Sequence, residues 1–197
     1  MFQSGLGLQM KWVINAYNGN IDWIKEYTDD VVLYDKKELN VGYNIYDYMD
    51  YIVSNYDNLP DVVLFGKDNM LQRHITKQEF DKLVNNRTFT PLLTQNHITD
   101  GETAFYLNNI YHEKNNSWYL YSYPSKYYTK YEDFARDFNL PNPPYLPFAC
   151  GACYIVPKEN ILKHPKEYYA KLKELVSWHK TPAEAHLIER SLYNIWR

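Results

Sequence analysis

Short apolar runs alternate with amphipathic stretches along the first third of the chain. Runs of four residues at 12–15, 31–34 and 62–65 have the length and the side-chain types of buried strands. Apolar residues recur at helical spacing over 44–56 and at every third position over 20–27, which predicts a helix in each segment. Strands that alternate with helices predict an α/β fold, in which helices pack on a mostly parallel central sheet.

The second half of the chain is rich in aromatic residues and in turn-forming residues. The pattern predicts three further strands, at 104–111, 118–123 and 152–156, with a turn at 113–116 between the first two. The prolines of 141–144 predict a loop. Helical spacing predicts two more helices, at 165–179 and at 182–197.

Three predicted helix starts carry the Thr-x-x-Glu pattern of a capping box, at Thr76, Thr129 and Thr181. Pro182 would then occupy the first helical position of the last helix, where its missing N–H costs nothing. The chain shows no internal repeat and no linker, so we expect residues 1–197 to form a single domain. No glycine or asparagine ends the last helix, as expected either of a chain cut from a longer protein or of a C-terminal helix that frays.

The composition fits a globular protein and argues against several other classes. Hydrophobic residues make up 45% of the 197 residues and charged residues 23%. A net charge of −3 disfavours binding to nucleic acid through its phosphates. No apolar run is long enough for a membrane span, and residues 1–10 lack the regions of a signal peptide. The two cysteines favour a reducing compartment, so we expect a cytoplasmic protein.

Tyrosine is unusually frequent, with 21 residues. A tyrosine ring combines an apolar face with a polar tip, which suits surfaces that bind sugars. A compositional bias explains the number equally well, because asparagine and lysine are also frequent. Tyrosine content therefore leaves both interpretations open.

Polar residues follow each of the three N-terminal strands, at the end where open parallel sheets bind ligands. The loop that begins at Asn15 precedes a helix start, which suits an anion or a nucleotide. Asp35 follows the second strand and offers a carboxylate to a ribose or a base. Lys67 and Asp68 follow the third strand, where they suit phosphate neutralisation and a divalent cation. Ordinary strand-end turns explain each feature as well.

Residues beyond these strands extend the candidate site. Arg73 and His74 follow the third strand closely and can face the same cleft. On the last helix, His186 and Glu189 share a face with Arg190 and Tyr193, because their spacings are three and four. That polar stripe indicates either a site or an internal salt bridge with hydrogen bonds from the tyrosine. In a site, Glu189 would act as a base or a cation partner, and Arg190 or His186 would bind phosphate.

Cys150 and Cys153 form a Cys-x-x-Cys motif. A closed zinc site needs four ligands, and no second cysteine pair exists. A thioredoxin-like motif would open a helix, whereas this one leads into a predicted strand. A redox function is therefore disfavoured, and we expect Gly151 to let the backbone approach an acceptor or a packed helix closely.

The ordered set of motifs resembles a known family. The motifs are VINAYN at 13–18, WI at 23–24, NVG at 40–42, NYDNLPD at 55–61 before the strand 62–65, CGA at 150–152 before the strand ending at 156, ER at 189–190 and NIW at 194–196. They resemble small glycosyltransferases of the GT-A type, with a Rossmann-like sheet. They are also similar to the N-terminal glycosyltransferase domain with which large DNA viruses of green algae decorate their capsid glycan. The resemblance covers about residues 11–197.

This resemblance implies a nucleotide-sugar donor, usually UDP-linked, a Mn²⁺ or Mg²⁺ cofactor, and a glycan or glycoprotein acceptor. For a viral member, the location would be the host cytoplasm. The residues expected to bind the nucleotide sugar are Asn15, Ala16, Tyr17, Asn18, Asp35, Lys36, Gly42, Asn44, Lys67 and Arg190. Asp68 would match the metal-binding aspartate of the family's D-x-D motif. The chain departs from that motif, because residues 67–70 contain one aspartate instead of two.

Glycosyl transfer also needs a group that accepts the proton of the acceptor hydroxyl. Glu189, Asp100 and Glu102 are candidates, with Glu189 preferred and with Asp68 as the second catalytic residue. Two rival functions are a carbohydrate- or nucleotide-binding module without catalysis, and a thiol oxidoreductase that uses Cys150 and Cys153.

Overall fold

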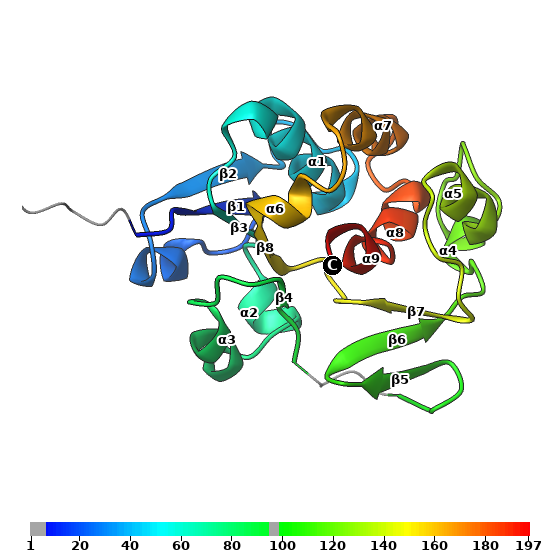
Figure 1. Ribbon diagram of the computed structural model, residues 1–197, viewed down its shortest axis with the longest axis horizontal. Helices are drawn as coiled ribbons and strands as arrows, with labels where there is room; N and C mark the ends of the chain where they lie inside the picture. Colours follow the sequence, from blue (N-terminus) through cyan, green and yellow to red (C-terminus); the bar gives the residue numbers. More distant parts are fainter. Residues whose placement is uncertain (1–6, 95–98) are drawn as a thin grey trace, which may run out of the picture.

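The main sheet of the computed structural model has five strands and is mixed (Figure 1). The structure describes residues 7–94 and 99–197. The strand order is β2 (Val31–Asp35), β1 (Met10–Ala16), β3 (Val62–Lys67), β8 (Tyr154–Pro157) and β4 (Thr90–Pro91). β1 pairs in parallel with β2 and β3, as predicted, whereas β8 runs antiparallel to both of its neighbours.

The prediction of a mostly parallel sheet is therefore wrong for the C-terminal half of the sheet. The loop before β8 lies at the carboxyl end of β3, because Gly151 of that loop and Lys67 of β3 line the same pocket. A strand that enters the sheet from this end has to run opposite to β3. The coarser prediction of a single α/β domain is confirmed.

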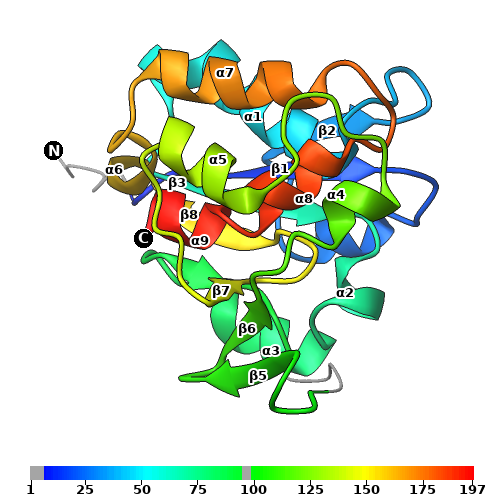
Figure 2. The same cartoon turned by 90° about the vertical axis from the view of Figure 1, so that its right-hand side faces the viewer.

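Helices cover both faces of the sheet (Figures 1 and 2). One face packs against α1 (Tyr43–Asn55), α7 (Lys166–Val176), α8 (Ala183–Glu189) and α9 (Leu192–Trp196). The opposite face packs against the 3-10 helix η1 (Asp22–Glu26), α2 (Met70–Arg73) and α3 (Lys77–Leu83). Short helices lie elsewhere along the chain: η2 (Tyr56–Asn58), α4 (Tyr119–Ser122), α5 (Tyr131–Asp137) and α6 (Lys158–Ile161).

Alternation along β3 explains the two cores. Phe65 faces the α1 side, where Trp196 of α9 stacks on it with ring centres 5.1 Å apart. Leu64 faces the opposite side and joins the cluster around Trp12, whose ring meets Phe80 of α3 edge-on. Because both faces are covered, β1 and β3 are continuous apolar runs, and the sequence pattern therefore located these two strands correctly.

A second, antiparallel sheet has the order β5 (Ala104–Leu107), β6 (Ile110–Lys114) and β7 (Tyr145–Phe148), and in both views it lies far from α7. The predicted single strand at 104–111 is wrong. The chain turns at Asn108 and Asn109, which both have positive φ angles of 51° and 62°, as a tight hairpin turn requires. β7 was not predicted; it is an edge strand and so tolerates Pro147.

Other local predictions also fail. Residues 118–123 form α4 instead of a strand, and the predicted helix at 182–197 breaks between α8 and α9. The Thr76 hydroxyl accepts a hydrogen bond from the N–H of Glu79, as predicted, but no side chain caps α5 or α8 in this way. Glu184 accepts hydrogen bonds from the backbone of the 126–127 loop instead. No helix in the described part of the chain is long and apolar enough to cross a membrane.

Candidate functional site

A pocket of about 230 Å³ lies at the carboxyl end of β3. Its polar groups come from the start of α1, the ends of β3, α2 and α4, the loop before β8, and α8. The lining residues are Tyr43, Asn44, Ile45, Lys67, Arg73, His74, Tyr123, Gly151, Ala185, His186 and Glu189. The predictions that Lys67, Arg73 and His74 share one cleft are confirmed. Asn44 and Glu189 line the same cleft.

The start of α1 is held at the pocket by Gly42. This glycine has a φ angle of +62° and donates its N–H to the carbonyl oxygen of His179, 2.9 Å away. A Cβ atom here would lie 2.6 Å from the carbonyl oxygen of Val176, so the close contact between α1 and the end of α7 requires glycine. Gly42 therefore positions the helix and does not line the pocket.

Gly151 joins three walls of the pocket. Its carbonyl oxygen accepts a hydrogen bond from the Asn44 amide at 3.0 Å, and its N–H donates to Glu189 Oε1 at 2.7 Å. Its φ angle is +90°, and a Cβ atom would lie 2.5 Å from the His74 imidazole. The glycine in the Cys-Gly-Ala-Cys segment thus serves close approach, as the sequence indicated.

Glu189 lies in the wall of the pocket as a carboxylate. Burial alone would raise its pKa, but the hydrogen bond with His186 and the charges of Arg190 and His186 lower the pKa to about 2. The distance from Glu189 Oε2 to His186 Nδ1 is 3.7 Å. A pKa this low makes Glu189 a weak proton acceptor, so its geometry favours a role in positioning Gly151 and His186.

Replacing this carboxylate is expected to change the pH dependence of stability. A carboxyl whose pKa falls on folding stabilises the protein above its unfolded pKa of 4.5 and loses that contribution as the pH falls through about 2. Glu189→Gln should therefore lower the free energy of unfolding by on the order of 3 kcal/mol at neutral pH, with a smaller cost below about pH 4. Urea unfolding at several pH values measures this. Glu174→Gln, an exposed change on α7, is the control. A cost that stays constant with pH would contradict the assignment.

His186 was grouped with the phosphate-binding candidates, and the structure places it among aromatic rings. Its ring centre lies 4.3 Å from that of Tyr123 and 5.6 Å from that of Tyr43. The ring centres of Trp118 and Tyr119, at the start of α4, also lie within 6.3 Å of that of His186. The pocket therefore offers aromatic faces and hydrogen-bonding groups together, a combination that suits a sugar ring.

Asp68 lies outside this pocket and accepts hydrogen bonds from the backbone of the loop after β1, residues 17–19. Its Oδ2 atom accepts hydrogen bonds from the N–H groups of Tyr17, Asn18 and Gly19 at 2.8, 3.2 and 2.6 Å. The residue is 4% exposed, and a Cβ atom at Gly19 would lie 2.7 Å from the carboxylate. Asp68 thus fixes the loop after β1.

The residues present do not fit a divalent cation at Asp68. The Oδ2 atom already accepts three N–H groups, which leaves at most the Oδ1 atom of this residue for a cation. Within 7–94 and 99–197, no group of three or more His, Cys, Asp or Glu side chains is placed to hold a metal ion. The predicted Mn²⁺ or Mg²⁺ cofactor therefore has no donor set within these residues on which a reaction step can be built.

Lys36 is also engaged inside the protein. Its ammonium donates to the carbonyl oxygens of Val41 and Tyr43 and to Asp47 Oδ1, at 2.8, 3.0 and 2.9 Å. Asp47 accepts a further hydrogen bond from the Asn15 side chain. Three partners saturate an ammonium, so Lys36 holds the 36–43 loop and the start of α1.

The other predicted site residues lie beside the pocket or away from it. Ala16 and Asp35 end neighbouring strands, and the Asp35 carboxylate accepts the N–H of Lys37 at 2.9 Å. The Tyr17 hydroxyl donates to the Asn40 side chain at 3.0 Å, and Asn18 is exposed. These loops lie beyond the carboxyl ends of β1 and β2.

Arg190 points away from the pocket. Its Nε atom donates to Glu113 Oε2 at 2.6 Å, and its guanidinium lies over the ring of Tyr119. This buried ion pair joins α8 to β6, which agrees with the internal salt-bridge alternative. Asp100 and Glu102 lie in the exposed loop before β5 and do not line the pocket.

Both cysteines are poorly suited to thiol chemistry. Burial raises the pKa of Cys150, and it raises the pKa of Cys153 to about 12. A thiol with a raised pKa stays protonated at neutral pH and reacts slowly. The geometry therefore disfavours an oxidoreductase.

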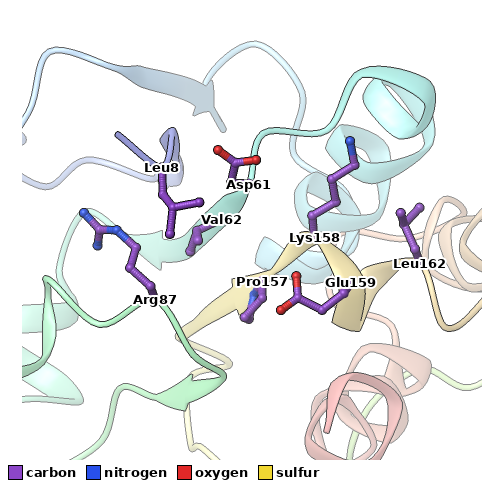
Figure 3. A pocket seen from close by; sticks show the side chains of 8 residues that line it. All are labelled: Leu8, Asp61, Val62, Arg87, Pro157, Lys158, Glu159 and Leu162. Carbon is purple, nitrogen blue, oxygen red and sulfur yellow. The ribbon is translucent and has the colours of Figure 1, made fainter. Parts of the chain in front are cut away.

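Another cavity, of about 270 Å³, lies at the opposite end of β3 (Figure 3). It lies around the start of β3 and the end of β8, and its lining includes the charged residues Asp61 before β3, Lys158 at the start of α6 and Arg87 before β4. This is the amino end of the parallel strands, and the side chains carry both charges. We therefore take the pocket around Gly151 as the candidate site, because ligands of α/β sheets bind at the carboxyl ends.

Comparison with known proteins places the chain in a family. Residues 9–197 match the family described as "Protein of unknown function (DUF3431)". No curated protein and no solved structure matches the chain. Since the match covers nearly the whole chain, including every element of the pocket, the chain belongs to the DUF3431 family.

Proposed function

We propose that the protein is a glycosyltransferase of the GT-A type, which transfers a sugar from a nucleotide-sugar donor, UDP-linked by resemblance, to a glycan or glycoprotein. The observation that carries the proposal is the pocket at the carboxyl end of β3. It combines aromatic rings with an amide, a carboxylate and cationic side chains in a volume of about 230 Å³. Tyr43 and Tyr123 offer ring faces to a sugar. The side-chain oxygen of Asn44 offers an acceptor to a sugar hydroxyl, since the amide nitrogen already donates to Tyr48 and Gly151.

The neighbouring loops suit the nucleoside of the donor. The backbone after β1 is rigid, because Asp68 holds its N–H groups, and Asp35 lies at the end of the adjacent strand. In the transfer, the bond between the anomeric carbon and the phosphate oxygen breaks, and a bond to the acceptor oxygen forms. The bonding electrons stay on the nucleoside diphosphate, and the acceptor proton leaves to solvent or a base.

The first test is a calorimetric titration with UDP and with UDP-glucose. Wild-type protein is expected to bind both. Tyr123→Ala should weaken binding of UDP-glucose about tenfold and change binding of UDP less than about twofold, because only the sugar contacts this ring. Tyr121→Ala is the matched control, since Tyr121 lies in the adjoining helix α4, is 77% exposed and does not line the pocket. Equal losses for both ligands would contradict a sugar subsite at Tyr123.

A binding module without catalysis is the second candidate. Two observations favour it. The low pKa of Glu189 makes this residue a weak proton acceptor, and Asp68 is occupied in holding the loop after β1. Release of UDP from UDP-sugars, with and without acceptor glycans, distinguishes the two. Turnover above the rate without protein supports the transferase, whereas tight binding with no turnover over a panel of donors supports the module.

A further inference from the structure

Two cationic side chains of the pocket have no ion-pair partner within the described chain. Lys67 ends β3, and Arg73 ends α2; both line the pocket. Two other cations contrast with them: Lys36, which follows β2, is saturated by three acceptors, and Arg190, which follows α8, is paired with Glu113. Within the described residues, therefore, no carboxylate forms an ion pair with Lys67 or Arg73.

The wall opposite these cations also favours an anion. Residues 43–45, the first turn of α1, line the pocket, and no side chain caps this helix end. The first turn of α1 contains no acidic residue. A helix of 13 residues has a partial positive charge at its start, which adds to the field of the two cations.

The pocket's carboxylate does not neutralise these cations. Glu189 is the single acidic residue among those described as lining the pocket, and its oxygens face Gly151, His186 and Arg190. Asp68, the residue that the resemblance assigns to a metal ion, holds three backbone N–H groups outside the pocket.

We propose that Lys67 and Arg73, with the start of α1, bind the diphosphate of the donor in place of a divalent cation. This inference rests on the proposed function. The leaving diphosphate gains negative charge as the glycosidic bond breaks, and fixed cations stabilise that charge as a metal ion would. Binding and transfer are then independent of Mn²⁺ and Mg²⁺.

Calorimetry with UDP and with inorganic pyrophosphate tests the proposal, in EDTA and in Mn²⁺. We expect both ligands to bind in EDTA, with affinities within about twofold of those in Mn²⁺. Lys67→Met and Arg73→Met should each lower the binding affinity for both ligands about tenfold, as expected when a charge-assisted contact is lost. Lys171→Met, an exposed change on α7, should have no effect. The variants should keep the wild-type melting temperature, because neither cation has an ion-pair partner among the described residues.

The outcomes separate this inference from the proposed function. If UDP binds only when Mn²⁺ is present, the proposal of a metal-free phosphate site is wrong, and the transferase proposal still stands. Pyrophosphate that binds through Lys67 and Arg73, without any binding of UDP, supports the anion site and overturns the nucleotide-sugar donor. Failure of both ligands, or binding that is unchanged in both variants, overturns the assignment of the phosphate site.

Discussion

Asp68→Ala is expected to lower the free energy of unfolding by about 3–5 kcal/mol. The substitution removes the acceptor of three backbone N–H groups, and hydrogen bonds to a charged group contribute about 1.5–3 kcal/mol each before solvent replaces part of them. It also leaves a cavity under the loop 17–19. Urea unfolding at neutral pH measures the change.

Asp35→Ala is the matched control, because Asp35 ends the neighbouring strand and accepts one local N–H. Its cost should stay below about 1 kcal/mol. If Asp68→Ala were as stable as wild type, the carboxylate would be available for another role, and a ligand at Asp68 would have to be reconsidered. A loss of UDP binding in Asp68→Ala would not by itself indicate a metal, because the loop that the carboxylate holds would also be lost.

Lys36→Met is expected to cost about 3–5 kcal/mol at neutral pH, since it leaves the buried Asp47 without its cation. The side chains of this pair are 1% and 2% exposed, so water cannot take the place of the partner. Lys37→Met is the matched control one residue away, where the side chain is exposed. Its effect should lie within about 0.5 kcal/mol.

The pH dependence of this second result follows from Asp47. Burial raises the pKa of Asp47 to about 6, although Lys36 and Asn15 favour the charged form. A carboxyl whose pKa rises on folding stabilises the protein below its unfolded pKa of 3.8 and loses that contribution as the pH rises through about 6. Lys36→Met should therefore be least destabilising in acid, where Asp47 is protonated and needs no cation. Unfolding at several pH values that showed the largest deficit in acid would contradict this account.

The hydrophobic pattern of the sequence predicted a helix or strand correctly where that element buries a continuous face of its side chains. β1 and β3 are continuous apolar runs because helices cover both sides, and α1 repeats apolar residues at helical spacing. The same reasoning failed for 118–123. There the aromatic residues pack around His186 and Arg190 from a short helix, and no strand partner exists for them in the described chain.

The candidate site could be predicted only in part for a related reason. The strand-end residues, such as Lys67 and Asp68, follow directly from strand positions. Whether a polar residue faces a ligand or the fold depends on distant neighbours, and the contact between Asp68 and the backbone of residues 17–19 has no local signature. The Gly151 backbone against His74 joins segments that lie far apart in the sequence, so no spacing along the chain predicts it.

The place of β8 in the sheet has a consequence for synthesis of the chain on the ribosome. β3 pairs with β8, which begins at Tyr154, and the Phe65 ring is covered by Trp196. The first three strands can pair early, but they keep an open edge and an exposed aromatic face until the C-terminal segments emerge. An unpaired edge of this kind is prone to association with other chains. Nascent chains of this protein should therefore depend on chaperones until the last helix has left the exit tunnel.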